Sequence, residues 1–198
     1  MITRLAKKCV AASVKGNIIP PQEAEFFTFA FSLLLSQAFG IATCVIIGLL
    51  FQCVIESMVY LMFFIPLRTF SGGFHAGSHL KCYISSVLLF GLSVGLGVSF
   101  GVNLPLFVVT ALYAGCMLTI LLLAPAEDKN KPLTEPEVEK CRMRVRLMAA
   151  VYSVLFAVAC CFSETRRYGV FLLLAVATVA ILVVISKIAQ AAGGKPKH

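Results

Sequence analysis

Long stretches without a charged residue constrain this chain more than any other feature of its sequence. Residues 82–126 contain no Lys, Arg, Asp or Glu, and this run is about twice the roughly 20 residues that a helix needs to cross a membrane. The chain is 60% hydrophobic and 13% charged, whereas soluble domains are about 45–50% apolar and about 25% charged. We therefore expect an integral membrane protein and exclude soluble, disordered, collagen-like and nucleic-acid-binding classes.

The uncharged runs divide into six expected transmembrane helices, which form a single all-α membrane domain over residues 1–198. Gly101, Asn103 and Pro105 interrupt the longest run and predict a tight turn between two helices. The second expected span contains Glu56 about one turn inside it, so a re-entrant segment fits that stretch as well as a crossing does. The expected spans are 26–47, 51–67, 83–101, 105–124, 147–163 and 168–186.

The basic residues predict the orientation of the chain. Basic side chains accumulate in the short cytoplasmic loops of membrane proteins. If both termini and the loops 68–82 and 125–146 face the cytoplasm, 15 of the 17 Lys and Arg residues lie on that side. Arg166 and Arg167 then face outward. The net charge of +8 is therefore mainly a topology signal, and we expect no nucleic-acid partner.

Residues 1–25 predict a cytoplasmic amphipathic helix. Apolar and basic residues fall on opposite sides when the first part of this stretch is placed on a helix. Such a helix can lie on the inner leaflet, in contact with membrane lipids. A frayed basic tail that only sets the topology is the alternative. The apolar side holds Ile2, Leu5, Ala6, Cys9, Ala12 and Ser13, and the basic side holds Arg4, Lys7, Lys8 and Lys15.

The segment 68–82 carries the residues best suited to chemistry. It contains His75 and Cys82, and an imidazole that takes the proton of a thiol creates a nucleophile for acyl transfer. Seven residues along one straight helix would separate the two by about 10.5 Å, so the segment must bend between them, and Gly77-Ser78 is the expected place. If Ser78 caps the next helix, Cys82 lies near its first turn, where the helix dipole favours the thiolate.

Other interpretations of this segment remain open. His79, three residues before Cys82 on a shared helix face, is a rival base. His75, His79 and Cys82 could instead bind a metal, although no fourth ligand is evident. A glycine-rich loop with an incidental His and Cys is the third interpretation. For the acyl-transfer site we expect no metal and no cofactor, and we expect the N–H groups of Gly72 and Gly73 to stabilise an oxyanion.

Two stretches of the chain resemble the AgrB family, the accessory gene regulator membrane endopeptidases of Gram-positive bacteria. The first is the pattern Arg68, Gly72-Gly73-Phe74-His75-Ala76 and Cys82, in which the glycine pair, the His and the Cys match in order and spacing. The second is the segment 124–133. The size, the six hydrophobic segments and the basic amphipathic start also agree, so the resemblance spans most of the chain.

The resemblance implies a cysteine endopeptidase of the bacterial cell membrane that processes an AgrD-type propeptide in quorum sensing. The residues that match the family's catalytic pair are His75 and Cys82. Cys82 would cut off the acidic C-terminal tail of the propeptide and hold the remainder as a thioester. An internal Cys or Ser of the propeptide would then close a thiolactone or lactone ring. A small transporter or peptide exporter without peptidase activity, and a membrane scaffold, are the alternatives.

Three basic residues are candidates for substrate binding. Arg68 could bind an acidic group of the substrate or anchor the end of the second span in the interface. Lys129 and Lys131 could receive the acidic tail or act only as a topology signal. The stretch Thr134-Glu135-Pro136-Glu137 has the pattern of a capping box and predicts a helix that continues into the fifth span.

Two further features of the spans carry expectations. Glu56 is the one acidic residue within an expected span, and its place near the outer surface predicts that it is solvated. The third span contains two pairs of small residues in which the members are four positions apart. This spacing suits either a homodimer interface or close packing within the chain. These small residues are Gly91, Gly95, Gly97 and Gly101.

Overall fold

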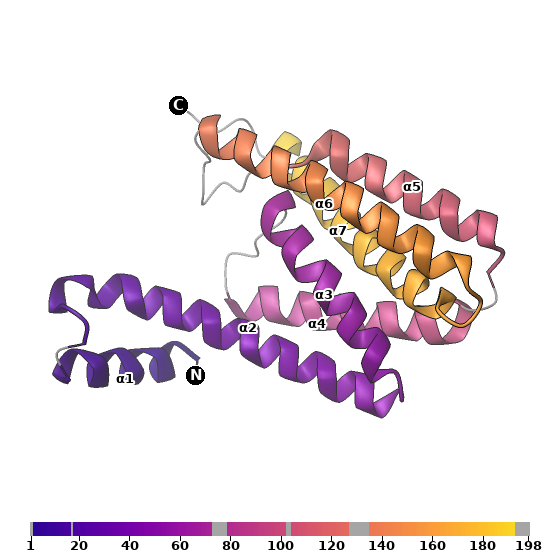
Figure 1. The fold of residues 1–198 in the computed structure, drawn as a ribbon. Helices are drawn as coiled ribbons and strands as arrows, with labels where there is room; N and C mark the ends of the chain where they lie inside the picture. The colour runs from indigo at the N-terminus through magenta and orange to yellow at the C-terminus, as the bar shows by residue number, and fades with distance from the viewer. Residues whose placement is uncertain (1, 17, 73–78, 102–103, 127–134, 193–198) are drawn as a thin grey trace.

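The computed structural model describes residues 2–16, 18–72, 79–101, 104–126 and 135–192. Within these ranges the chain is helical and contains no named β-strand. Figure 1 shows α3, α5, α6 and α7 side by side as a bundle, while α1 and the first half of α2 extend away from it. The elements are α1 (Ile2–Lys15), a 3₁₀ turn (Pro21–Glu23), α2 (Ala24–Leu50), α3 (Val54–Ser71), α4 (His79–Leu96), a π-helical turn (Gly97–Gly101), α5 (Leu106–Leu123), α6 (Glu135–Cys161) and α7 (Arg166–Ala192).

The helices confirm the expected all-α membrane fold. Five of them are long and apolar enough to cross a membrane, and they correspond to the first, second, fourth, fifth and sixth expected spans. The third expected span is a shorter apolar helix, Tyr83–Ser99. It starts within α4 and runs into the π-helical turn. The helix expected after residue 134 is also present, because α6 begins at Glu135 and continues without a break to Cys161.

α7 is the central helix of the bundle. Of the 18 residues in the most apolar stretch of α7, 72% are buried inside the protein, whereas 12% are buried in the corresponding stretch that contains α2. It contacts α3, α4, α5 and α6. A helix that is apolar around its whole circumference needs apolar neighbours on every side, and the buried residues of α7 cover all of its faces. They include Val170, Phe171, Leu172, Leu173, Ala175, Val176, Val179, Ala180 and Val183.

A few polar contacts cross the apolar interior. The hydroxyls of Ser93 on α4 and Thr178 on α7 lie 3.2 Å apart, and both residues are buried. The Tyr152 hydroxyl on α6 donates to the carbonyl of Phe63 on α3 at 3.2 Å. A polar group in hydrocarbon is costly unless it is hydrogen-bonded. These pairs therefore favour one arrangement of α3, α4, α6 and α7.

The expected stripe of glycines divides between two roles. A Cβ atom at Gly97 would lie 2.8 Å from the ring of Phe171 and 3.0 Å from Leu174, both on α7. Gly97 therefore allows the end of α4 to approach the central helix. A Cβ at Gly91 or Gly95 would meet nothing within 4 Å. Packing within the chain accounts for Gly97 and leaves Gly91 and Gly95 on an open face.

The N-terminal segment forms the expected helix. α1 lies alongside α2 (Figure 1), and among its described side chains Ala6 and Val10 are buried. Leu5 and Cys9, which the helical pattern places on the apolar side, are exposed, as a side that lies on lipid would be. α2 covers one narrow side of α1.

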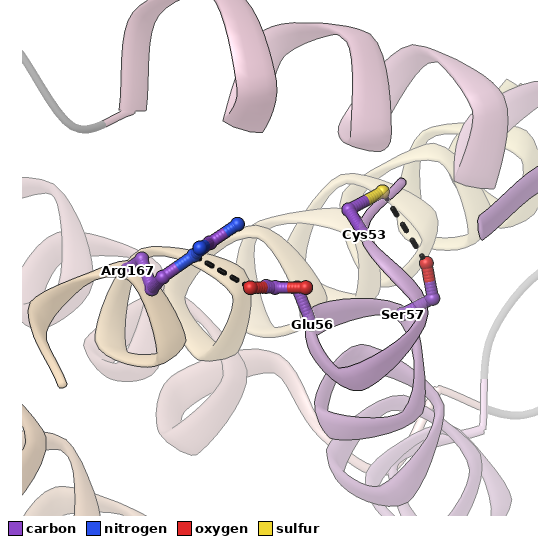
Figure 2. Close-up of polar contacts among 4 residues, drawn as sticks. All are labelled: Cys53, Glu56, Ser57 and Arg167. Atoms are coloured by element: carbon purple, nitrogen blue, oxygen red, sulfur yellow. Dashed lines mark hydrogen bonds and ion pairs between the residues drawn. The ribbon is translucent and has the colours of Figure 1, made fainter. Parts of the chain in front are cut away.

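The expectation that Glu56 is solvated is wrong. Its side chain is 5% exposed, and its Oε1 lies 2.5 Å from Nε of Arg167, whose side chain is 49% exposed. Figure 2 shows the carboxylate on α3 facing the guanidinium at the start of α7. A buried carboxylate needs such a cation, because hydrocarbon solvates neither charge. We call this end of the bundle the Arg167 end and the opposite end of α3 the Gly72 end.

The neighbouring arginine also joins two parts of the chain at the Arg167 end. A guanidinium N–H of Arg166 donates to the carbonyl of Leu104, just before α5. Arg166 and Arg167, the two arginines expected to face outward, thus connect the start of α7 with the starts of α3 and α5. Both arginines make contacts within the chain that orientation rules alone do not predict.

Gly97→Ala is expected to lower the free energy of unfolding by about 1–3 kcal/mol, because the added methyl overlaps the buried ring of Phe171. Thermal unfolding of the detergent-solubilised protein measures this change. Gly95→Ala is the matched control, since its methyl meets no atom. Equal destabilisation by the two substitutions would contradict the packing described for Gly97.

Arg167→Gln is expected to destabilise the protein by about 2 kcal/mol, because it leaves the Glu56 carboxylate buried without its cation. The double variant Glu56→Gln with Arg167→Gln places two neutral amides together and should recover most of that loss. Unfolding midpoints of the wild type, the single variant and the double variant test the pair. A double variant as unstable as Arg167→Gln would show that the carboxylate is not the source of the loss.

Candidate active site

The candidate site begins where α3 ends. Arg68 lies in the last turn of α3, and the helix ends at Ser71, which is buried. Gly72 follows with φ 69° and ψ −150°. Only glycine adopts this backbone region readily, because any Cβ would collide with the adjacent backbone. The glycine therefore allows an abrupt change of chain direction at the start of the segment expected to carry the chemistry.

Gly72 also contacts the stretch that follows α5. The amide of Ala126 donates to the carbonyl of Ser71 at 2.9 Å, and Gly72 and Ala126 form an isolated parallel bridge. A Cβ at Gly72 would lie 2.2 Å from the carbonyl oxygen of Ala126. Two stretches more than 50 residues apart in the sequence thus meet through their backbones, and small side chains make this approach possible.

α4 begins on the other side of the expected catalytic segment. It starts at His79 and places Cys82 as its fourth residue. Ser78, the predicted cap, lies outside the described residues. Backbone N–H groups in the first turn of a helix have no partner within the helix, and they favour an anion nearby. The backbone position of Cys82 therefore suits a thiolate.

α6 approaches the end of α3 at the same place. The guanidinium carbon of Arg144 lies 4.9 Å from the centre of the Phe70 ring, a distance at which the ring attracts a cation. A guanidinium stacked on a ring keeps its in-plane N–H donors available. Arg144 therefore adds a positive group near the junction of α3 with Gly72.

The structure describes some of the predicted site residues and not others. Gly72 and Arg68 lie together at the end of α3, and Cys82 is described by its backbone in α4. The predicted residues His75, Gly73, Lys129 and Lys131 lie outside the described residues. The structure therefore brings Arg68 and Gly72 close to the chain that leads to Lys129 and Lys131, because Ala126 contacts Gly72.

The sequence did not indicate that Ala126, Phe70 and Arg144 border this site. The contact between Ser71 and Ala126 depends on how α3 and α5 each pack against α7, and no local pattern encodes it. In the sequence, Arg144 is only one of the basic residues that predict the orientation of the chain. A pairing signal was available for Glu56, since an acid within a span needs a partner and Arg166 and Arg167 were the expected basic residues on that side.

Comparisons with known proteins give one consistent result. A family model described as Accessory gene regulator B matches residues 3–190. An AgrB-like protein 2 of Clostridium perfringens is 24% identical over 143 residues, which cover 69% of this chain and 66% of that protein. Accessory gene regulator protein B of Staphylococcus intermedius is 23% identical over 130 residues, which cover 64% of this chain and 66% of that protein.

An AgrB-like protein of Listeria monocytogenes is 29% identical over 128 residues, with 65% of this chain and 59% of that protein covered. The chain thus spans about 59–66% of the length of these three relatives. No solved structure matches it.

Gly72→Ala is expected to break the contact with Ala126, because a side chain is strained at this φ and its Cβ would overlap the Ala126 carbonyl. The cost of the backbone strain alone is about 1–3 kcal/mol. Peptide-resolved hydrogen exchange should show faster exchange at residues 124–126. Gly40→Ala, whose methyl would meet nothing within 4 Å, should leave that exchange unchanged. Unchanged exchange in Gly72→Ala would mean that the contact does not constrain the chain.

Proposed function

Because this chain belongs to the accessory gene regulator B family, we propose that it is a membrane-embedded cysteine endopeptidase of quorum sensing. Its substrate is an AgrD-like propeptide with an acidic C-terminal tail. Cys82 is the nucleophile and His75 is the base. The product is a cyclic peptide closed by a thioester or an ester.

The first step removes the tail of the propeptide. His75 takes the proton of the Cys82 thiol, and the thiolate attacks the carbonyl carbon of the scissile peptide bond. The carbon–nitrogen bond then breaks, and the imidazolium of His75 gives its proton to the leaving amine. The N-terminal part of the propeptide stays on Cys82 as a thioester. The backbone N–H groups of Gly72 and Gly73 are the proposed donors to the oxyanion that forms during the attack.

The second step closes the ring. A thiol or hydroxyl inside the bound propeptide loses its proton to His75 and attacks the thioester carbonyl. The bond to the Cys82 sulfur breaks, and Cys82 leaves as the thiolate. Exchange of one thioester for another conserves the activated acyl bond, which hydrolysis would lose. Exclusion of water from the site favours cyclisation over hydrolysis.

The observation that carries this proposal is the position of the helix ends around the segment 72–82. Gly72, with a φ of 69°, ends α3 before the segment that carries His75 and Cys82, and α4 begins at His79. Cys82 lies in the first turn of α4, where a thiolate is favoured. The distribution of basic residues supports a location of this segment on the reducing, cytoplasmic side of the membrane.

Basic residues around the Gly72 end are the proposed substrate-binding groups. Arg68 lies in the last turn of α3, and Arg144 on α6 is stacked on Phe70, two residues after Arg68 in the same helix. Lys129 and Lys131 follow Ala126, which contacts Gly72, within five residues of chain. An acidic tail that binds these groups would lie beside the proposed nucleophile.

The exporter alternative depended on Glu56 as a polar residue lining a path. Glu56 is instead buried and paired with Arg167. Its position at the Arg167 end also separates it from the segment 72–82 by the length of α3. The peptidase is therefore the function that we propose.

Purified protein incubated with an AgrD-like propeptide is expected to release the tail and to carry a propeptide adduct on Cys82, both detected by mass spectrometry. Cys82→Ala and His75→Ala should each abolish both signals, because they remove the nucleophile and the base. His79→Ala should retain tail release. Far-ultraviolet circular dichroism of each variant shows that the helices remain.

Continued tail release by Cys82→Ala would exclude the proposed nucleophile. Loss of activity in His79→Ala but not in His75→Ala would show that His79, and not His75, is the base. Inhibition by a chelator would favour the metal interpretation of the same residues.

A further inference from the structure

A small cavity lies at the Arg167 end of the bundle. Its volume is about 100 Å³, which is room for roughly three water molecules. The turn between α2 and α3, the π-helical end of α4 and the first turn of α7 form its walls. The proposed catalytic segment is at the other end of α3, so this cavity is separate from the site described above.

The backbone around the cavity is unusual in two places. Gln52 has a φ of 53°, a left-handed conformation that residues other than glycine seldom adopt. The amide of Cys53 then donates to the carbonyl of Gly48 at 2.8 Å and ends α2 with a sharp turn. On the facing wall, α4 changes to a π-helix at Gly97, and such turns are frequent at functional sites.

One charged side chain lines the cavity. Arg167 is among the described lining residues and its partner Glu56 is not. Its Nε is bonded to Glu56, and Figure 2 shows a guanidinium nitrogen turned away from that carboxylate. A guanidinium has five N–H donors in a planar fork, which matches the oxygens of a phosphate group.

The rest of the lining is largely apolar. The rings of Phe51 and Phe171 and the side chain of Val98 contribute to it, and Leu49 and Leu50 beside the turn are exposed. Arg167 immediately precedes the expected sixth span, so the cavity lies where a helix leaves the hydrocarbon layer. A free inorganic anion gains nothing from apolar walls, whereas a lipid carries a phosphate and hydrocarbon in one molecule.

We propose that this cavity binds the phosphate of an anionic membrane lipid through Arg167, with the start of the acyl chains along Phe51 and Val98. The bound phosphate shares the guanidinium with Glu56. The carboxylate therefore holds Arg167 in place and at the same time weakens the attraction for the lipid, because two anions compete for one cation. This role is independent of the peptidase function.

The test uses the full-length protein extracted from vesicles of equimolar phosphatidylglycerol and phosphatidylcholine, with retained lipids counted by native mass spectrometry. The wild type should retain phosphatidylglycerol in preference to phosphatidylcholine. The double variant Glu56→Gln with Arg167→Gln, which buries no lone charge, should reduce retained phosphatidylglycerol about tenfold through loss of the charged donor. Glu56→Gln alone should retain more phosphatidylglycerol than the wild type. Lys187→Gln, which removes the same charge from the other end of α7, should match the wild type.

A second arm separates a lipid from a free anion. Inorganic phosphate is titrated into the protein in neutral detergent while thermal unfolding is followed, and no stabilisation at millimolar concentration is expected. If inorganic phosphate stabilised the wild type and did not stabilise the double variant Glu56→Gln with Arg167→Gln, the lipid assignment would be overturned. Equal retention of the two lipids by the wild type, or unchanged retention of phosphatidylglycerol by the double variant, would overturn the proposal itself.

Discussion

The apolar character of α7 on all of its sides is the constraint on which the bundle depends. Lipid and other helices are both apolar surroundings for such a helix, so burial by itself does not select one neighbour. Close packing and a few polar pairs make the selection. Gly97 lets α4 approach the ring of Phe171, and Thr178 meets the hydroxyl of Ser93. Both contacts position α4 against α7.

The two ends of the bundle are held together by different means. At the Arg167 end, charged side chains join helices, since Arg167 pairs with Glu56 and Arg166 donates to Leu104. At the Gly72 end, a backbone hydrogen bond joins Ser71 to Ala126.

Much of the fold was predictable because helices in a membrane satisfy their own backbone hydrogen bonds. Uncharged runs therefore locate them, and α4 and α6 lie where the sequence predicts helices. Glu56 was predicted wrongly because its solvation depends on which helix covers it.

The candidate site was predictable in its residue types and not in its surroundings. His75, Cys82 and the glycine pair lie close together in the sequence, so local spacing and a family resemblance were sufficient to predict them as site residues. Nothing local indicates that Ala126 contacts Gly72 or that Arg144 stacks on Phe70. Those contacts require α3 and α5 to end close together and α6 to pass beside the end of α3.

The sequence by itself determined that this chain is a membrane protein, where its helices begin and end, and which segment carries a histidine and a cysteine. It could do so because hydropathy, helix capping and residue spacing act over one or two turns of the chain. Only the tertiary structure decided that Glu56 is paired, that Gly97 contacts the central helix and that Ser71 is bonded to Ala126. Each of these depends on residues many positions apart, and only packing around α7 brings them together.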